Sequence, residues 1–300
     1  MLGLGCAAVD DLLYVPSFPA ADQKMRVDRH LRRCGGLTGA ALVTAARMGA
    51  RCAYAGCLGT DEYSRCVAED FAAAGVDTSQ APRLAKARVV HSTIVVGQNS
   101  GSRNIFFEDQ GMIGTHATRP AVAVIRAARV VFIDHLGMPG NLRAARLARA
   151  AGVGVVADFE NDTHPLFQQV LRLVDHLVLS EEFALRITRK RSAAQAAQAL
   201  WENDRAVVIV TCGAQGCWSV TADDGLKPRH HPAFLVKAAD TTGCGDVFHG
   251  AYAASLARGD SFQERIRFAS AAAAVKARQS EIPRRAAVEE FLKQQPSSTP

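Results

Sequence analysis

Short apolar runs alternate with helical patterns through the second half of the chain. The runs occupy residues 130–133, 153–157, 177–179 and 207–210, and patterns of helical period lie between them at 141–150, at 166–173 and up to Trp201. Runs rich in β-branched residues, without polar alternation, predict strands that are buried on both faces. A helix between successive strands of this kind predicts parallel crossover connections. We therefore expect an α/β sandwich built on a mostly parallel sheet.

Two stretches of the first half break this rhythm because polar and apolar residues alternate in them. Residues 24–32 alternate with apolar Met25, Val27 and Leu31 on one face. Residues 88–96 and 103–107 alternate around residues 98–102, which predict a hairpin turn. We expect these stretches to form a small β-sheet of the kind that closes over an active site.

The domain organisation follows from these patterns. A single domain over residues 1–293 carries the lid segments, roughly 12–34 and 86–112. Residues 294–300, rich in Gln, Ser and Pro, are expected to form a flexible tail.

The composition is that of an ordinary globular chain of 300 residues, with 48% hydrophobic and 21% charged residues and a mean hydropathy of +0.01. It excludes a disordered, collagen-like or disulfide-scaffold protein, and no apolar run approaches the roughly 20 residues of a membrane span. The net charge, 35 minus 29 or +6, is too small an excess to indicate a nucleic-acid partner. No basic leader precedes the apolar N-terminus, and the eight cysteines form no Cys-x-x-Cys pair. We therefore expect a cytoplasmic protein with reduced thiols, no membrane partner and no structural zinc site.

The most informative segment is Asp240-Thr241-Thr242-Gly243-Cys244-Gly245-Asp246, which opens an amphipathic helix. The free amides of a first helical turn, together with the positive end of the helix dipole, form a site for developing negative charge. Capping of the helix accounts for Asp246 but not for Asp240, the two threonines or the paired glycines. An anion site that faces a carboxylate base is what phosphoryl transfer to a hydroxyl requires.

Three further motifs each leave two interpretations open. Gly3-Leu4-Gly5-Cys6-Ala7-Ala8 is not followed by a helix, so we interpret it as the first central strand rather than a dinucleotide-binding turn. This strand would deliver Asp10 at its end, where a carboxylate either accepts hydrogen bonds from a polyol or caps its own loop. Gly35-Gly36 either lets a ligand approach the backbone or serves as a simple helix entry. Thr211-Cys212-Gly213-Ala214-Gln215-Gly216 follows a buried strand and suits either a ligand or a plain hairpin.

Taken in their order along the chain, these four motifs resemble those of the ribokinase-like (PfkB) carbohydrate kinases, from about Leu2 to Pro283. The resemblance implies a ribokinase-like three-layer α/β/α sandwich with a mostly parallel central sheet and a small β-sheet lid. It implies a sugar as acceptor, ATP as donor, Mg²⁺ as cofactor and a monovalent cation as a further candidate. Because the lid sheets of the family often pair, it also implies a homodimer through the lid.

The resemblance assigns roles to residues at matching positions. Asp246 matches the general base, which we expect to have a low pKa beside the helix amides. Gly243, Cys244 and Gly245 match the anion hole, and Asp10, Gly35 and Gly36 match sugar-binding positions. The matches to the nucleotide site are Ser180, Thr211, Gly213, Gly216, Thr241, Gly243 and Gly245. Asp240 corresponds to a residue near the monovalent-cation site of the family.

The chain also departs from the pattern of the family. Ser180-Glu181-Glu182-Phe183 stands where the family has Asn-x-x-Glu, so Glu181 or Glu182 would have to reach Mg²⁺ through water. Ala40 replaces an Asn after the glycine pair, which removes a hydrogen bond to the sugar. The glycine-containing loop is shortened to residues 279–283, which leaves potassium activation open.

Two C-terminal segments and the basic residues of the lid bear on which sugar is the acceptor. Residues 242–251 and 267–276 look most like the branch that contains sulfofructose kinase, and Lys24 sits at a similar lid position to a basic residue of that branch. The cationic side chains Lys24, Arg26 and Arg32 favour a ketose or anionic sugar, such as sulfofructose, a sugar phosphate or a keto-deoxy sugar acid. A solvated lid strand or a subunit contact accounts for them equally well. Alternatives are a nucleoside kinase of the same fold and a sugar- or nucleotide-binding protein with weak catalysis.

Overall fold

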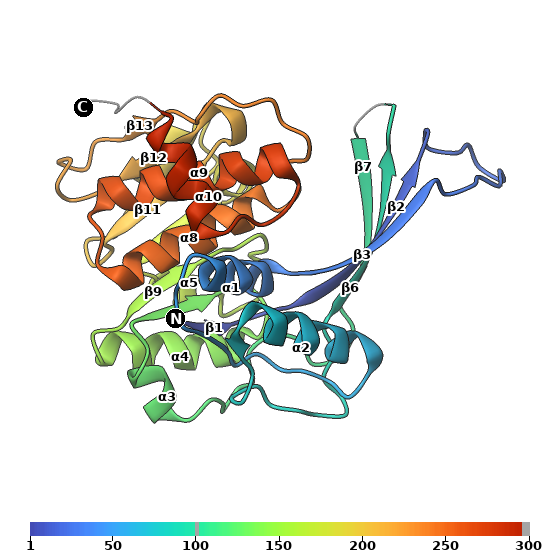
Figure 1. Ribbon diagram of the computed structural model, residues 1–300. Helices are drawn as coiled ribbons and strands as arrows, with labels where there is room; N and C mark the ends of the chain where they lie inside the picture. The colour runs from blue at the N-terminus through green and yellow to red at the C-terminus, as the bar shows by residue number, and fades with distance from the viewer. Residues whose placement is uncertain (100–101, 296–300) are drawn as a thin grey trace.

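A computed structural model of the chain describes residues 1–99 and 102–295, which form two β-sheets and the helices around them (Figure 1). The predicted turn residues 100 and 101 and most of the predicted tail, residues 296–300, lie outside the described residues. In spatial order, the strands of the nine-stranded sheet are β13 (Arg229–His231), β12 (Cys217–Val220), β11 (Val207–Thr211), β10 (His176–Ser180), β9 (Gly154–Ala157), β8 (Val130–Ile133), β1 (Leu2–Leu4), β4 (Cys52–Tyr54) and β5 (Val76–Asp77).

The large sheet is parallel from β5 to β11, and only β12 and β13 run antiparallel at one edge. Alternate residues of its strands enter two separate cores, so that Phe132 packs on one side of the sheet and Val131 and Ile133 on the other. The apolar runs of the sequence therefore supply side chains to both faces. This confirms the predicted α/β sandwich with a mostly parallel central sheet.

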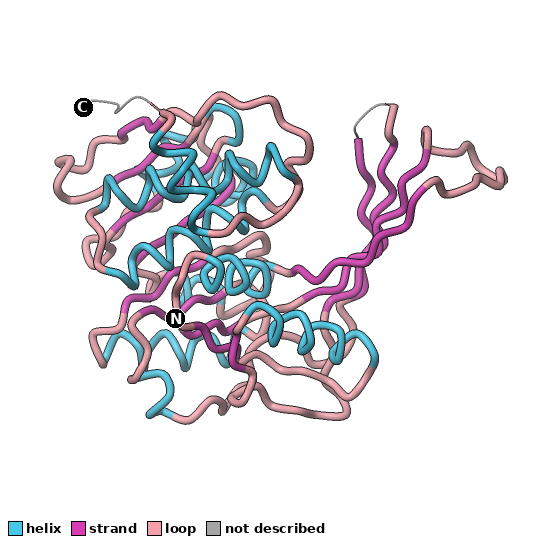
Figure 2. Tube along the Cα trace, in the orientation of Figure 1, coloured by secondary structure: helices cyan, strands magenta, loops and turns pink. Residues whose placement is uncertain are grey.

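Helices cover both faces of the sheet (Figure 2). On one face pack α1 (Leu37–Arg47), α2 (Glu62–Ala74), α8 (Cys244–Arg258), α9 (Phe262–Gln279) and α10 (Arg285–Lys293). On the other pack α3 (Val122–Arg126), α4 (Met138–Ala150), α5 (Phe167–Leu171), α6 (Glu181–Thr188) and α7 (Ala193–Ala199). A short 3₁₀ turn, η1 (Gly213–Gln215), follows β11. Among the described residues, none of the helices combines the length and the apolar character needed to cross a bilayer.

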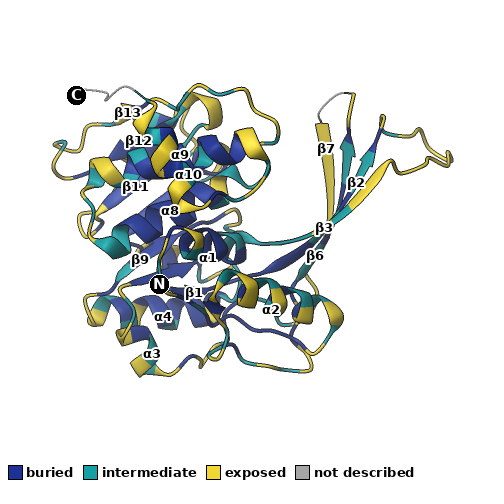
Figure 3. Ribbon diagram, viewed as in Figure 1, coloured by how far each residue is buried: buried dark blue, intermediate teal, exposed yellow. Residues whose placement is uncertain are grey.

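The second sheet is the expected lid, and it projects from the body (Figure 1). It has four strands in the order β3 (Arg29–Gly35), β2 (Ala8–Val15), β6 (Val90–Gly97) and β7 (Ser102–Glu108). All residues of β7 are exposed (Figure 3), with Phe106 and Phe107 62% and 64% accessible. The homodimer through the lid stays a prediction.

Two expectations about the lid are wrong. The first central strand, β1, ends at Leu4, and Asp10 lies inside the lid strand β2 rather than at the end of a central strand. The chain leaves the large sheet at Gly5, whose φ of +152° suits glycine, and then enters the lid. The alternating residues 24–28 belong to the loop before β3, which starts only at Arg29.

A buried carboxylate fixes the point where the chain passes from body to lid. Asp134, fully buried after β8, accepts hydrogen bonds from the Cys6 amide at 2.7 Å and the Thr38 hydroxyl at 2.7 Å. Its other oxygen accepts from the Leu136 amide at 2.8 Å. Asp134 therefore ties the end of β1 to the start of α1 and to the loop after β8.

We predict that Asp134→Ala lowers the free energy of unfolding by about 3 kcal/mol, because three donors, those of Cys6 and Thr38 buried and that of Leu136 half-buried, lose their acceptor. Urea unfolding followed by circular dichroism measures this loss. The control Asp134→Asn keeps the shape and an acceptor oxygen and should lose less. An alanine variant within about 1 kcal/mol of the wild type would contradict this role.

Candidate active site

The carboxyl ends of the parallel strands carry polar residues along one edge of the large sheet. Asp134 follows β8, Asp158 follows β9, and Ser180 and Thr211 end β10 and β11 as direct neighbours in register. In open α/β sheets, ligands bind at this edge. Asp134 and Asp158 were not among the residues that the sequence predicted for the site, although each directly follows a predicted strand.

Helix α8 starts at this edge without a side-chain cap. Its N-cap residue is Gly243, in the left-handed region with φ 74°, and among the described residues no side chain accepts a capping hydrogen bond there. The capping explanation of Asp246 is therefore not supported. The amide of Cys244 donates to the carbonyl oxygen of Thr241 at 3.2 Å, whereas the next two amides, those of Gly245 and Asp246, are available to an anion. Asp246 also adds a carboxylate in the same turn.

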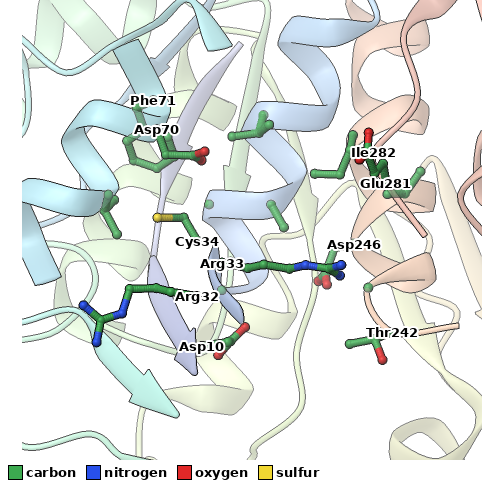
Figure 4. A pocket seen from close by; sticks show the side chains of 18 of the residues that line it. Asp10, Arg32, Arg33, Cys34, Asp70, Phe71, Thr242, Asp246, Glu281 and Ile282 are labelled. Carbon is green, nitrogen blue, oxygen red and sulfur yellow. The ribbon is translucent and has the colours of Figure 1, made fainter. Parts of the chain in front are cut away.

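A cavity of about 700 Å³ joins this helix start to the base of the lid (Figure 4). It is lined by Asp10, Gly35 and Gly36 from the lid side and by Thr242, Gly243 and Asp246 from the start of α8. Predicted sugar-binding and phosphoryl-transfer positions that are more than 200 residues apart in sequence thus line one space. A second cavity of about 540 Å³ lies beside it and includes Thr241, Asp240 and Arg33.

The electrostatics of Asp246 differ from the expectation. Burial and then the charge of Asp158 raise the pKa of the Asp246 carboxyl above its usual range, with His249 acting in the opposite direction. The predicted low pKa is therefore wrong, because burial and the second carboxylate outweigh the helix amides. A raised pKa makes Asp246 a stronger base toward a hydroxyl proton.

His249 packs beneath this pair and is 3% exposed. Its Nδ1 lies 2.7 Å from the carbonyl oxygen of Gly245 and its Nε2 lies 3.0 Å from that of Val178. Both ring nitrogens thus face carbonyl oxygens, and Asp158 Oδ2 lies 3.5 Å from Nδ1. His249 thereby connects the first turn of α8 to β10.

Burial also raises the pKa of Asp10, and the Ser92 side chain partly offsets this effect. Asp10 lies opposite Arg33 on β3 and Ser92 on β6, so the three side chains share one face of the lid. Gly35 lies next to Asp10, because an added Cβ at Gly35 would stand 2.9 Å from its Oδ2.

The basic residues of the lid divide between its two faces. Arg33 extends toward the Asp246 side of the cavity, whereas Arg32 extends the opposite way (Figure 4). Arg32 donates to Asp11 at 2.8 and 3.0 Å and to Glu62 at 3.0 Å. The predicted contact Lys24 is exposed in the loop before β3 and lines neither cavity. The sequence analysis missed Arg33, although strand alternation places it on the face of Asp10.

Of the predicted nucleotide residues, Gly243 lines the first cavity and Thr241 the second. The others line neither cavity: Ser180, Thr211, Gly213, Gly216 and Gly245. The hydroxyl oxygen of Ser180 accepts from the Phe183 amide at 3.3 Å and so caps α6, and Phe183 is a core residue, 3% exposed. Thr211 donates to the carbonyl oxygen of Leu179 at 3.3 Å. Gly216 has φ 93°, and a Cβ there would lie 2.0 Å from the carbonyl oxygen of His231, so this turn requires glycine. Gly213 opens η1.

The predicted metal ligands are not gathered into a cluster. Glu181 is half-buried and Glu182 exposed, both in the first turn of α6. Within residues 1–99 and 102–295, no group of three or more His, Cys, Asp or Glu side chains could hold a metal ion. Asp240 instead faces two cations, with Arg33 Nη1 at 3.6 Å and Lys276 Nζ at 3.4 Å from its Oδ2.

Comparison with known proteins agrees with this geometry. Residues 4–282 match the family model described as pfkB family carbohydrate kinase. The chain is 28% identical to a ribokinase of Haemophilus influenzae over 96% of this chain and 97% of that protein. It superposes on the crystal structure of a putative ribokinase from Agrobacterium tumefaciens with a TM-score of 0.88, 28% identity and coverage of 98% and 97%. Arabidopsis thaliana ribokinase complexed with ribose and ATP shares the fold, with a TM-score of 0.84 at 22% identity over 98% of each chain.

We predict that the Asp246 carboxyl titrates well above the pH of about 4 typical of aspartate. The ¹³Cγ shift of labelled aspartate, assigned by comparison with Asp246→Asn, measures the midpoint. Asp158→Asn removes the neighbouring negative charge and should lower that midpoint by about one pH unit. A wild-type midpoint near the ordinary value would contradict the assigned environment.

Proposed function

Because the chain belongs to the pfkB family of carbohydrate kinases, we propose that it transfers the γ-phosphoryl group of ATP to a hydroxyl of an anionic or keto sugar. The observation that carries the proposal is the single cavity lined by Asp10, Gly35 and Gly36 on one side and by Gly243 and Asp246 on the other. A sugar hydroxyl held by Asp10, Gly35 and Gly36 would lie within reach of Gly243 and Asp246.

The roles of the residues follow from the demands of the reaction. The transition state of phosphoryl transfer is loose, so positioning and charge stabilisation dominate over covalent chemistry. The amides of Gly245 and Asp246 at the start of α8 would receive the negative charge of the transferring group. Asp246 would accept the proton of the attacking hydroxyl, and its raised pKa suits that task near neutral pH.

The nucleotide would lie along the edge formed by Ser180, Thr211 and the turn from Gly213 to Gly216. Mg²⁺ in kinases is held largely by the nucleotide phosphates and water, with one or two carboxylates. Glu181 and Glu182 fit that limited contribution, although they form no metal cage of their own. When bound, the ion neutralises phosphate charge.

The lid supports an acceptor that carries a phosphate, sulfonate or carboxylate group. Arg33 lines both cavities on the face of Asp10. Its 3.6 Å contact with Asp240 is too long for a hydrogen bond, so its donors are available to a ligand. A guanidinium recognises such anions through paired hydrogen bonds. Sulfofructose, sugar phosphates and keto-deoxy sugar acids all have this chemistry.

The test of catalysis is Asp246→Asn, which removes the base without changing side-chain shape. We predict a fall in kcat of at least about 100-fold and an unchanged fold. Coupled detection of ADP with an acceptor sugar measures turnover, and thermal melting serves as the control for folding. Turnover well above background and equal in both proteins would remove Asp246 from the mechanism. If both proteins bind sugar and ATP but neither forms ADP above background, the chain is a binding protein.

The test of the acceptor is Arg33→Ala, assayed with sulfofructose, fructose 6-phosphate, 2-keto-3-deoxygluconate, fructose, ribose and a nucleoside. We expect KM to rise about 10-fold or more for the anionic acceptors and little for the neutral ones. Arg26→Ala is the matched control, since Arg26 carries the same charge but is exposed in the loop before β3 and lines neither cavity, whereas Arg32 lines the first cavity together with Arg33. Lys24→Ala tests the position that the sequence favoured.

Two outcomes would contradict the role of Arg33 in binding an anionic acceptor. One is a wild-type preference for a neutral sugar or nucleoside that Arg33→Ala leaves unchanged. The other is an equal fall in kcat with every acceptor, which would place Arg33 on the transferring phosphoryl group instead.

A further inference from the structure

Lys276 is a buried ammonium beside the proposed phosphoryl site. It lies on α9 and is 4% exposed, between buried Val275 and Ala277. Its Nζ is 3.4 Å from the carbonyl oxygen of Asp240 and 3.4 Å from Oδ2 of the same residue. Taking a lysine out of water costs several kcal/mol unless partners compensate for the lost hydration. A position with no need of charge would therefore be expected to carry an apolar residue.

The two oxygens that Lys276 contacts belong to the segment that leads into α8. The amides of Ala239 and Asp240 both donate to the carbonyl oxygen of Ala277, at 2.7 and 3.2 Å. Oδ1 of Asp240 accepts from the Thr242 amide at 2.9 Å. Asp240 thus connects α9 to the residues that precede the anion site. Lys276 on α9 contacts Asp240 and helps to hold it in place.

Lys276 also brings its charge to the cavity, because it lines the same 700 Å³ space as Asp246 and Gly243. Asp240 remains ionised there. Burial raises its pKa, but the Thr242 amide and Lys276 more than offset this effect, so the pKa is lowered overall. An ionised carboxylate thus lies beside the Lys276 Nζ at the edge of the cavity.

These contacts conflict with the monovalent-cation site that the sequence assigned to Asp240. Potassium needs several oxygen ligands, and the carboxylate and carbonyl oxygens of Asp240 already face the ammonium. A second cation on the same oxygens would be repelled by the first. The residues present do not fit the ion.

We propose that the Lys276 ammonium takes the place of a dissociable monovalent cation, so that phosphoryl transfer depends on Lys276 and not on potassium. Lys276 acts as a positioning residue that holds the loop of residues 240–243 and adds fixed positive charge. The expected effect of Lys276 on the rate of phosphoryl transfer rests on the proposed kinase function. The expected binding of a cation where the Lys276 ammonium has been removed does not.

The experiment compares the wild type with Lys276→Met and Lys276→Ala. Methionine fills the space without charge, and alanine leaves room for an ion. Turnover is measured in potassium, ammonium, sodium and choline chlorides at equal ionic strength, and thermal melting of the same proteins is measured in the same salts without substrates.

We expect the wild type to work equally well in all four salts and its melting temperature to be the same in potassium and choline. Lys276→Met should lose about 10- to 100-fold in kcat in every salt. Lys276→Ala should lose as much in choline and recover several-fold in potassium or ammonium, and these two ions should raise its melting temperature. If Lys276 had only a structural role, potassium and ammonium would not restore turnover in Lys276→Ala while leaving Lys276→Met unchanged.

Three outcomes would overturn the proposal. They are marked activation of the wild type by potassium over choline, near wild-type turnover of Lys276→Met, and failure of potassium and ammonium to affect Lys276→Ala in either assay. If no sugar is phosphorylated by the wild type, the proposed function fails. The melting temperatures then still decide whether a cation replaces the Lys276 ammonium.

Discussion

The structure depends on one arrangement, in which a helix without a side-chain cap begins at the carboxyl edge of a parallel sheet and carries a carboxylate in its first turn. Gly243 makes this possible, because its left-handed backbone turns the chain into α8 and, among the described residues, no side chain caps the amides of Gly245 and Asp246. The same turn places Asp246 next to those amides. One helical turn therefore supplies both the amides that attract an anion and the carboxylate that can accept a proton from a hydroxyl.

The residues around the first turn of α8 hold it in place and influence the protonation of Asp246. From the sheet side, Asp158 and His249 lie beneath it, and Asp158 raises the proton affinity of Asp246. From the α9 side, Lys276 fixes Asp240. From the lid, Arg103 donates to the Thr242 hydroxyl at 3.0 Å and Arg33 approaches Asp240. The loop of residues 240–243 is thus one of the places where body and lid meet through polar contacts.

The sequence predicted the body of the fold well, because strands buried on both faces and helical periods leave direct patterns in the order of residues. The family resemblance assigned Asp10, the glycine pair and Asp246 to one site, and these residues line one cavity, whereas the turn of residues 211–216 lies outside it. The sequence analysis placed Asp10 on the wrong sheet, because the break at Gly5 depends on the close approach of Asp134, 129 positions later.

The remaining errors have the same physical origin in long-range contacts. The pKa of Asp246 depends on burial and on Asp158, neither of which the local sequence reveals. The choice between Arg32 and Arg33 depends on strand register, because neighbouring residues point to opposite faces. Lys276 looks like an ordinary polar position of a helix until α9 is seen packed against the segment that ends in Asp240.

The most direct test of the central claim is a crystal structure with ADP, a planar metal fluoride that mimics the transferring phosphoryl group, and an acceptor sugar. We expect the fluoride to lie within hydrogen-bond distance of the amides at the start of α8, with an acceptor hydroxyl between it and the Asp246 carboxylate. A fluoride bound away from these amides, or an Asp246 carboxylate turned away from the hydroxyl, would rule out this helix start as the site of phosphoryl transfer.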